Sequence, residues 1–177
     1  MAEELVITQV DNQASAAIND AIQDQIESGE IDYERMIITE KDTAGSVTAL
    51  HANIAGINRL KTEILNRVDE RLLDLSVEEL GVPLGSVILP ELFSGCGPNL
   101  AVRVLAVRTS DAVFHNEFTA AGINQTLHRI TIDINVTITI LTLAGTQDVE
   151  VDSSVIAAET VIVGQVPTTY IDMEELP

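Results

Sequence analysis

Hydrophobic residues recur at helical spacing in two segments of the N-terminal half. From Glu3 to about residue 28 they follow one another at steps of three and four, and Gly29 offers a left-handed stop. The second segment begins at Asn53, a good helix cap, and ends near Leu75. The repeating positions are Val10, Ala14, Ala17, Ile18, Ala21, Ile22 and Ile26 in the first segment, and Ile57, Leu60, Ile64, Val68, Leu72 and Leu75 in the second. The pattern predicts two amphipathic helices.

The C-terminal half changes to strict alternation of apolar and polar residues, which is typical of a strand with one buried face. The apolar positions are Ile130, Ile132, Ile134, Val136, Ile138 and Ile140. We expect strands at 101–118 and 147–163 to be its neighbours, because connections at 119–124 and 144–146 are short enough only for antiparallel pairing.

Two shorter β-prone runs lie between the predicted helices. Residues 33–39 and 47–52 flank a turn-rich stretch and predict a hairpin. Ser76 and Glu79 have capping-box spacing and predict a short helical turn, and residues 80–100, rich in glycine and proline, are expected to be irregular. The predicted fold class is therefore α+β, with two amphipathic helices packed on one face of a long-stranded antiparallel β-sheet. We expect one domain over residues 1–177, with an acidic, frayed tail at 171–177.

Charge narrows the classes of partner. The 177 residues include 28 Asp and Glu against 9 Lys and Arg, so the formal net charge is −19. A field of that sign repels phosphate backbones, which excludes nucleic acid as an expected partner. The chain is nevertheless 46% hydrophobic, with a mean hydropathy of +0.23, so it can build a core. It contains no apolar segment of signal-peptide or membrane-spanning length.

Candidate catalytic and metal-binding residues are scattered. Cys96 has no histidine near it in the sequence, and His51, His115 and His128 fall on different predicted elements. We therefore expect no metal and no cofactor, and we rank an enzymatic function below the two binding functions described below. An enzymatic function would be favoured if His128 or a carboxylate lay buried in a cleft with a strongly shifted pKa.

Three strings carry a family resemblance: Gly-Cys-Gly-Pro at 95–98, Ala-Gly-Ile-Asn-Gln-Thr from residue 121, continuing to residue 130, and Ala-Glu-Thr-Val-Ile-Val-Gly from residue 158, continuing to residue 167. Together they resemble the YunB sporulation proteins of endospore-forming bacteria, and the likeness covers about residues 14–170. The resemblance implies a protein made in the mother cell, needed for spore formation, with no assigned catalytic activity. It also implies an N-terminal membrane helix, which we expect ahead of residue 1 in the native protein.

The shared strings have two readings. Turn and bulge requirements explain them as fold maintenance. Alternatively they form a partner-docking surface, whose candidate residues are Asn124, Gln125, His128, Arg129, Glu159 and Gly164.

Two hypotheses for the function of this protein are compatible with the resemblance and the predicted fold. The first is a non-enzymatic protein, tethered to the membrane, that acts through contacts with other proteins at the forespore envelope. The alternative is a domain of tubular helix-plus-sheet type that binds a lipid or another apolar ligand between helices and sheet. A packed core would favour the first function, and a continuous apolar cavity the second.

Overall fold

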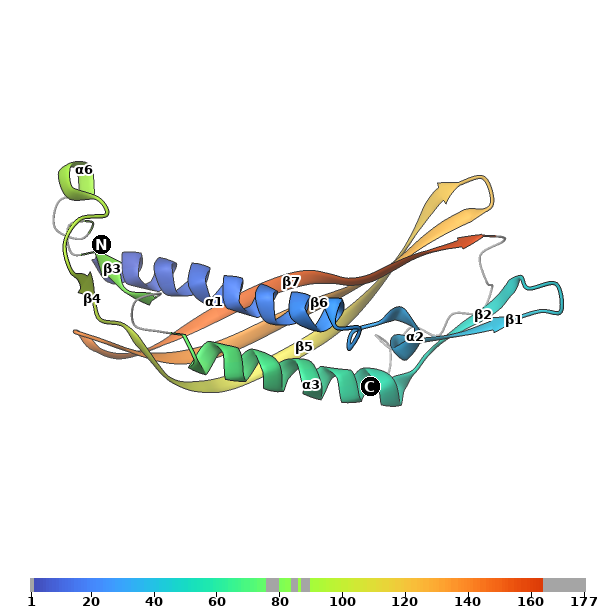
Figure 1. Cartoon of the computed structure of the whole chain (residues 1–177), viewed down its shortest axis with the longest axis horizontal. Helices are drawn as coiled ribbons and strands as arrows, with labels where there is room; N and C mark the ends of the chain where they lie inside the picture. Colours follow the sequence, from blue (N-terminus) through green and yellow to red (C-terminus); the bar gives the residue numbers. More distant parts are fainter. Residues whose placement is uncertain (1, 76–79, 84–85, 87–89, 164–177) are drawn as a thin grey trace. The chain divides into compact units, whose positions relative to one another are not determined.

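The computed structural model describes residues 2–75, 80–83, 86 and 90–163, and it combines helices with antiparallel sheets (Figure 1). The α+β fold class predicted from the sequence is confirmed. The elements in chain order are α1 (Ala2–Glu27), α2 (Tyr33–Met36), β1 (Ile37–Lys41), β2 (Val47–Ala52), α3 (Ile54–Leu73), β3 (Val82–Pro83), α6 (Pro90–Phe93), β4 (Asn99–Leu100), β5 (Arg103–Gly122), β6 (Gln125–Thr142) and β7 (Gly145–Val163).

The two long helices form where the periodicity predicts them. All six apolar positions predicted for the second helix are buried, five of them in α3 and the sixth, Leu75, two residues after its end. The apolar positions predicted for the first helix are buried in α1 as well, except the half-buried Ile26. Gly29 ends α1 with a φ of 76°, in the left-handed region that lacks a steric penalty only for glycine. Asn53 caps α3, because its Oδ1 accepts a hydrogen bond of 3.1 Å from the N–H of Gly56.

The predicted hairpin is present, but it begins later than expected. Residues 33–36, expected as strand, form the single helical turn α2, and β1 starts at Ile37. Tyr33 and Met36 are three residues apart, so a helical turn places their side chains on the same face. Met36 on this face is buried, with 1% of its surface exposed. Asn53 holds the end of this turn: its N–H donates to the carbonyl of Met36 at 2.8 Å. Propensity in the short run 33–39 could not reveal this tertiary contact.

The three long strands form one sheet in the order β5-β6-β7. Two-residue turns at 123–124 and 143–144 join them, which is tighter than the connections predicted from the sequence. The predicted alternation on β6 is confirmed, because its six apolar positions from Ile130 to Ile140 are at most 2% exposed while the residues between them are half-buried.

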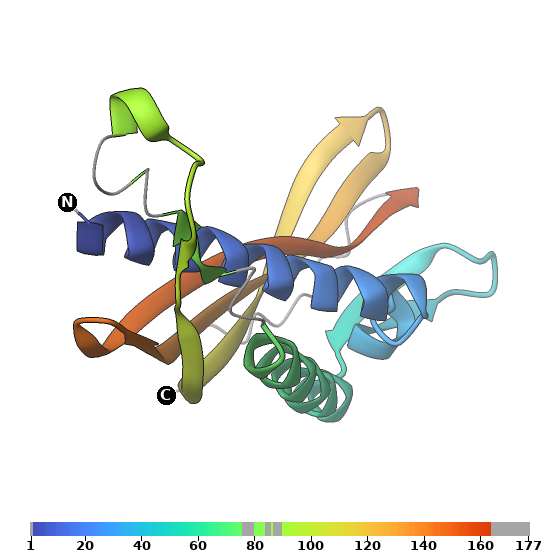
Figure 2. The same ribbon diagram turned by 60° about the vertical axis from the view of Figure 1, so that its left-hand side comes forward.

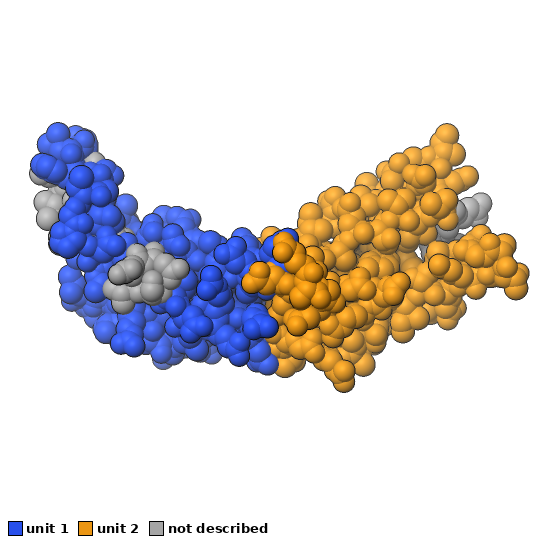
Figure 3. All heavy atoms as spheres, viewed as in Figure 1, with its two compact units in different colours: residues 1–23, 65–112, 134–153 blue, residues 24–64, 113–133, 154–177 orange. Residues whose placement is uncertain are grey.

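The chain divides into two compact units (Figure 3), which we describe separately. Unit 1 comprises residues 1–23, 65–112 and 134–153, and unit 2 comprises 24–64, 113–133 and 154–177. The helices α1 and α3 and the strands β5, β6 and β7 each contribute residues to both units. The expectation of one domain stays a prediction.

In unit 1, polar contacts join both helices to the buried face of the sheet. On β7, the Ser153 hydroxyl donates to Asn19 Oδ1 of α1 at 2.6 Å. On β5, the Ser110 hydroxyl donates to Asp69 Oδ2 of α3 at 3.4 Å, and burial raises the pKa of this carboxyl. Strands β3 and β4 pair antiparallel and lie beside the N-terminal part of α1 (Figure 2). The predicted turn at 76–79 lies outside the described residues.

Candidate functional site

The candidate binding residues of the sequence analysis belong to unit 2, and Gly164 lies outside the described residues. Asn124 lies in the turn between β5 and β6 with a φ of 57°, a left-handed conformation that asparagine tolerates better than most residues. Its neighbour Ile123 is 93% exposed, and Gln125 begins β6 with an exposed side chain. This turn therefore presents an apolar side chain next to two amides.

Arg129 and Glu159, which the sequence analysis assigned to one surface, form an ion pair. Arg129 Nε donates to Glu159 Oε2 at 2.8 Å, and its Nη1 lies 3.9 Å from Glu117 Oε2. The three side chains come from β6, β7 and β5 and form a ladder across the sheet on the face opposite the buried row. All three are more than one third exposed, so the ladder contributes little to stability and is accessible to a partner.

His128 is separated from this surface. It lies on β6 in phase with the buried row, and none of its surface is exposed. Because side chains alternate between the two faces of a strand, consecutive residues His128 and Arg129 point in opposite directions. His128 therefore offers nothing to an external partner.

The His128 ring is enclosed by three side chains, which we call the His128 cluster: Tyr33, Asn116 and Phe118. The Tyr33 hydroxyl lies 2.7 Å from Nδ1, and Asn116 Oδ1 lies 3.1 Å from Nε2. An amide oxygen only accepts, so the ring is protonated on Nε2 and accepts from Tyr33 at Nδ1. Phe118 stacks on the ring with centroids 4.2 Å apart and planes 5° apart. Both ring nitrogens are thus satisfied in the neutral state.

Burial lowers the pKa of His128 from 6.5 to about 4, because the charged imidazolium would lose its hydration. A buried histidine with a shifted pKa was the feature that would have favoured an enzyme. The ring is fully enclosed rather than open to a cleft, so a substrate has no access to it. The cluster links α2 to β5 and β6 and serves the fold.

Serine, histidine and aspartate also meet on the exposed face of unit 2. The Ser154 hydroxyl donates to Asp133 Oδ1 at 2.5 Å, and His115 Nε2 lies 3.0 Å from Asp133 Oδ2. In a nucleophilic triad the serine donates to the histidine, whereas here the carboxylate lies between the two. The arrangement is a cross-strand link between β5, β6 and β7.

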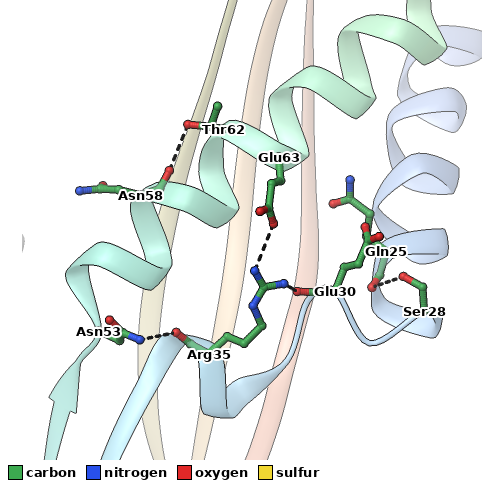
Figure 4. A network of polar contacts seen from close by, with 8 residues as sticks. All are labelled: Gln25, Ser28, Glu30, Arg35, Asn53, Asn58, Thr62 and Glu63. Carbon is green, nitrogen blue, oxygen red and sulfur yellow. Dashed lines mark hydrogen bonds and ion pairs between the residues drawn. The ribbon is translucent and has the colours of Figure 1, made fainter.

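A polar network in unit 2 joins α2 to the segment that follows α1, to Asn53 and to α3 (Figure 4). Arg35 donates to the backbone carbonyl of Glu30 and lies 3.2 Å from Glu63 Oε2 on α3. Its own carbonyl accepts a 3.0 Å hydrogen bond from Asn53 Nδ2. The position of Tyr33, and with it one side of the His128 cluster, depends on this network.

Tyr33, Asn116 and Phe118 could not be recognised from the sequence as neighbours of His128. One signal was present, since Thr126 and His128 continue the alternation of the isoleucines and should share their buried face. Among the described residues, no three His, Cys, Asp or Glu side chains lie close enough together to hold a metal ion, and the free Cys96 is exposed.

Residues 79–169, just over half of the chain, match the family model of the sporulation protein YunB (Spo_YunB). The chain therefore belongs to the YunB sporulation protein family, as its three strings predicted, and has a role related to sporulation. Searches of curated proteins and of solved structures found no match.

The match covers β3, α6 and β4 to β7, and none of the helices α1, α2 and α3. The described helices of the chain include none with the length and apolar character needed to cross a membrane.

Proposed function

We propose that this protein is a non-enzymatic sporulation protein that acts through contacts with other proteins at the forespore envelope, tethered there by an N-terminal membrane helix. The family supports the sporulation role. The observation that supports binding is that the exposed ladder of Arg129, Glu117 and Glu159 and the exposed Ile123 turn belong to the same strands and turn of unit 2. Exposed charged and apolar side chains of this kind make up the polar rim and the apolar centre of a protein interface.

The alternative, a lipid or other apolar ligand between helices and sheet, receives less support. A groove that holds an acyl chain leaves its lining side chains accessible when it is empty. The buried row on β6 is at most 2% exposed from Ile130 to Ile140, in both units. Burial of this row argues against an open apolar groove along β6.

A charge exchange tests the proposed surface. The double variant Arg129→Glu with Glu159→Arg keeps opposite charges on β6 and β7 but inverts what a partner meets. We expect at least a tenfold loss of heat-resistant spores when it replaces the natural protein in a sporulating strain, with thermal unfolding within a few degrees of the natural protein.

The matched control is Arg103→Glu, which changes an exposed charge on β5 in unit 1 and should leave spore counts unchanged. Normal spore counts for the folded double variant would contradict a role for this surface. Equal losses for both variants would show that the defect is not specific to this surface.

Native mass spectrometry of the protein, purified without detergent, tests the alternative. We expect a mass equal to one chain or a whole number of chains, because burial of the β6 row argues against an open groove. A lipid-sized adduct that survives desalting and disappears after delipidation would instead establish the ligand-binding function.

A further inference from the structure

The end of β7 in unit 2 is a free sheet edge of unusual composition. In the sheet order β5-β6-β7, the outer side of β7 pairs with no strand of the described chain. Val161 and Val163 are 50% and 67% exposed. Natural edge strands are usually protected from pairing by lysine, proline or a bulge, and residues 159–163 contain neither lysine nor proline.

Charge distinguishes this end from the rest of the strand. Asp148, Glu150 and Asp152 follow the unit 1 part of β7 at alternate positions. Asp148 pairs with Arg108, but Glu150 and Asp152 accept hydrogen bonds from the neutral amide of Asn135, so their charges would repel a second acidic chain. Residues 159–163 hold one charge, Glu159, and Arg129 already pairs with it. In a chain of net charge −19, this segment can therefore meet another copy without placing unpaired like charges opposite each other.

We propose that the protein dimerises by antiparallel pairing of this segment with the same segment of a second copy, about a two-fold axis at Val161. This pairing rests on the proposed function of acting through protein contacts and names a second copy as one partner. It places Val161 opposite Val161, Thr160 opposite Ile162, and Glu159 opposite Val163.

The exposure pattern agrees with this register. Glu159, Val161 and Val163 are exposed, whereas Ile162 is buried and Thr160 is half-buried, so the alternation is regular over the segment. Directly opposite residues in an antiparallel pair share a face, and the two-fold axis at Val161 matches exposed with exposed positions. β-Branched residues then lie opposite one another at the centre, which favours strand pairing.

A second copy is the occupant that the segment itself specifies. The pairing is isologous, so a single strand supplies both sides and the assembly closes at two chains. A different partner would need its own strand of matching length and composition, about which this chain carries no information. The charge of −19 on each chain opposes association, so dimerisation should strengthen as salt screens it.

Disulfide trapping tests the register in the full chain. In a Cys96→Ser background, Val161→Cys should give a covalent dimer on mild oxidation, because opposite Cα atoms lie about 4.5 to 5.5 Å apart, within disulfide range. Val163→Cys in the same background is the matched control. Its two copies would be about 13 Å apart along the strands, so it should stay monomeric on a reducing-agent-free gel. Equal cross-linking of both variants, or none of either, overturns the proposed pairing.

Light scattering coupled to size exclusion supplies a second measurement without cysteines. The natural chain should form dimers, and more of them in 0.5 M than in 0.05 M NaCl. Val161→Lys should shift the population to monomer at least tenfold, because two lysines would face each other, whereas Val113→Lys, on β5 of the same unit, should not. A natural chain that stays monomeric at 0.1 mM in both salts overturns the proposal. If Val161→Lys is a folded monomer and spore counts are normal, the natural protein does pair through this segment, but the pairing is not needed for sporulation.

Discussion

Replacing Gly56 by alanine should lower the free energy of unfolding by about 2 to 4 kcal/mol, although alanine is the better helix former by about 1 kcal/mol. A Cβ at this position would overlap the backbone carbonyl of Arg35 and lie 2.6 Å from Asn53 Nδ2. Relief requires α2 to move away from the start of α3. That movement breaks the hydrogen bond from Asn53 Nδ2 to the Arg35 carbonyl and disturbs the Asn53 cap.

Urea unfolding followed by circular dichroism measures this effect. The control is Arg59→Ala, at an exposed position of α3, which should change stability by less than about 0.5 kcal/mol. A Gly56→Ala protein as stable as the natural one would show that α2 and α3 are not held as closely as the Asn53 contacts indicate.

The sequence predicts the long elements of this fold because each is determined by its own periodicity. The alternating isoleucines of β6 and the three-to-four spacing of α3 encode which face is buried, and burial of that face is what stabilises the element. The cap at Asn53 and the stop at Gly29 are equally local, since each concerns hydrogen bonds or dihedral angles within a few residues.

The sequence does not predict α2, because its conformation depends on distant partners. Tyr33 meets His128 across 95 positions, and Arg35 meets Glu63 across 28. One turn of helix has little stability of its own, so tertiary contacts decide whether residues 33–36 continue as strand or turn. Local propensity depends only on residues close in sequence, so it cannot predict those contacts.

In the candidate site, too, some features follow from the local sequence pattern and others depend on contacts between distant residues. Arg129 and Glu159 were assigned to one surface from their strings, and the structure brings them into contact. His128 was assigned to that surface with them, although it lies on the opposite face of β6. Applying the alternation of the isoleucines two residues further toward the turn would have separated it from Arg129. Its partners Asn116 and Phe118 depend on the register of β5 against β6, which residue patterns alone do not determine.

The largest pH effect on stability should come from His128. Its pKa is about 4 in the folded protein and about 6.5 in the unfolded chain. Between these values the unfolded chain binds a proton that the folded protein does not, so stability falls as the pH decreases. The contribution of His128 to the free energy of unfolding is fully present above pH 6.5. It declines by about 1.4 kcal/mol per pH unit below that pH, to a total loss of about 3 kcal/mol near pH 4.

Comparison with His128→Gln isolates this contribution, because the glutamine does not titrate and the carboxylates common to both proteins cancel. The natural protein should lose its stability advantage over His128→Gln steadily from pH 6.5 to 4.5 in urea unfolding. Tyr33→Phe is the second control: it removes one hydrogen bond and costs about 1 kcal/mol at pH 7, but it should keep the pH slope, because burial rather than the hydroxyl lowers the pKa of His128. Parallel curves for the natural protein and His128→Gln would mean that the imidazole is hydrated in the folded protein, and the enclosure of the His128 cluster would then be wrong.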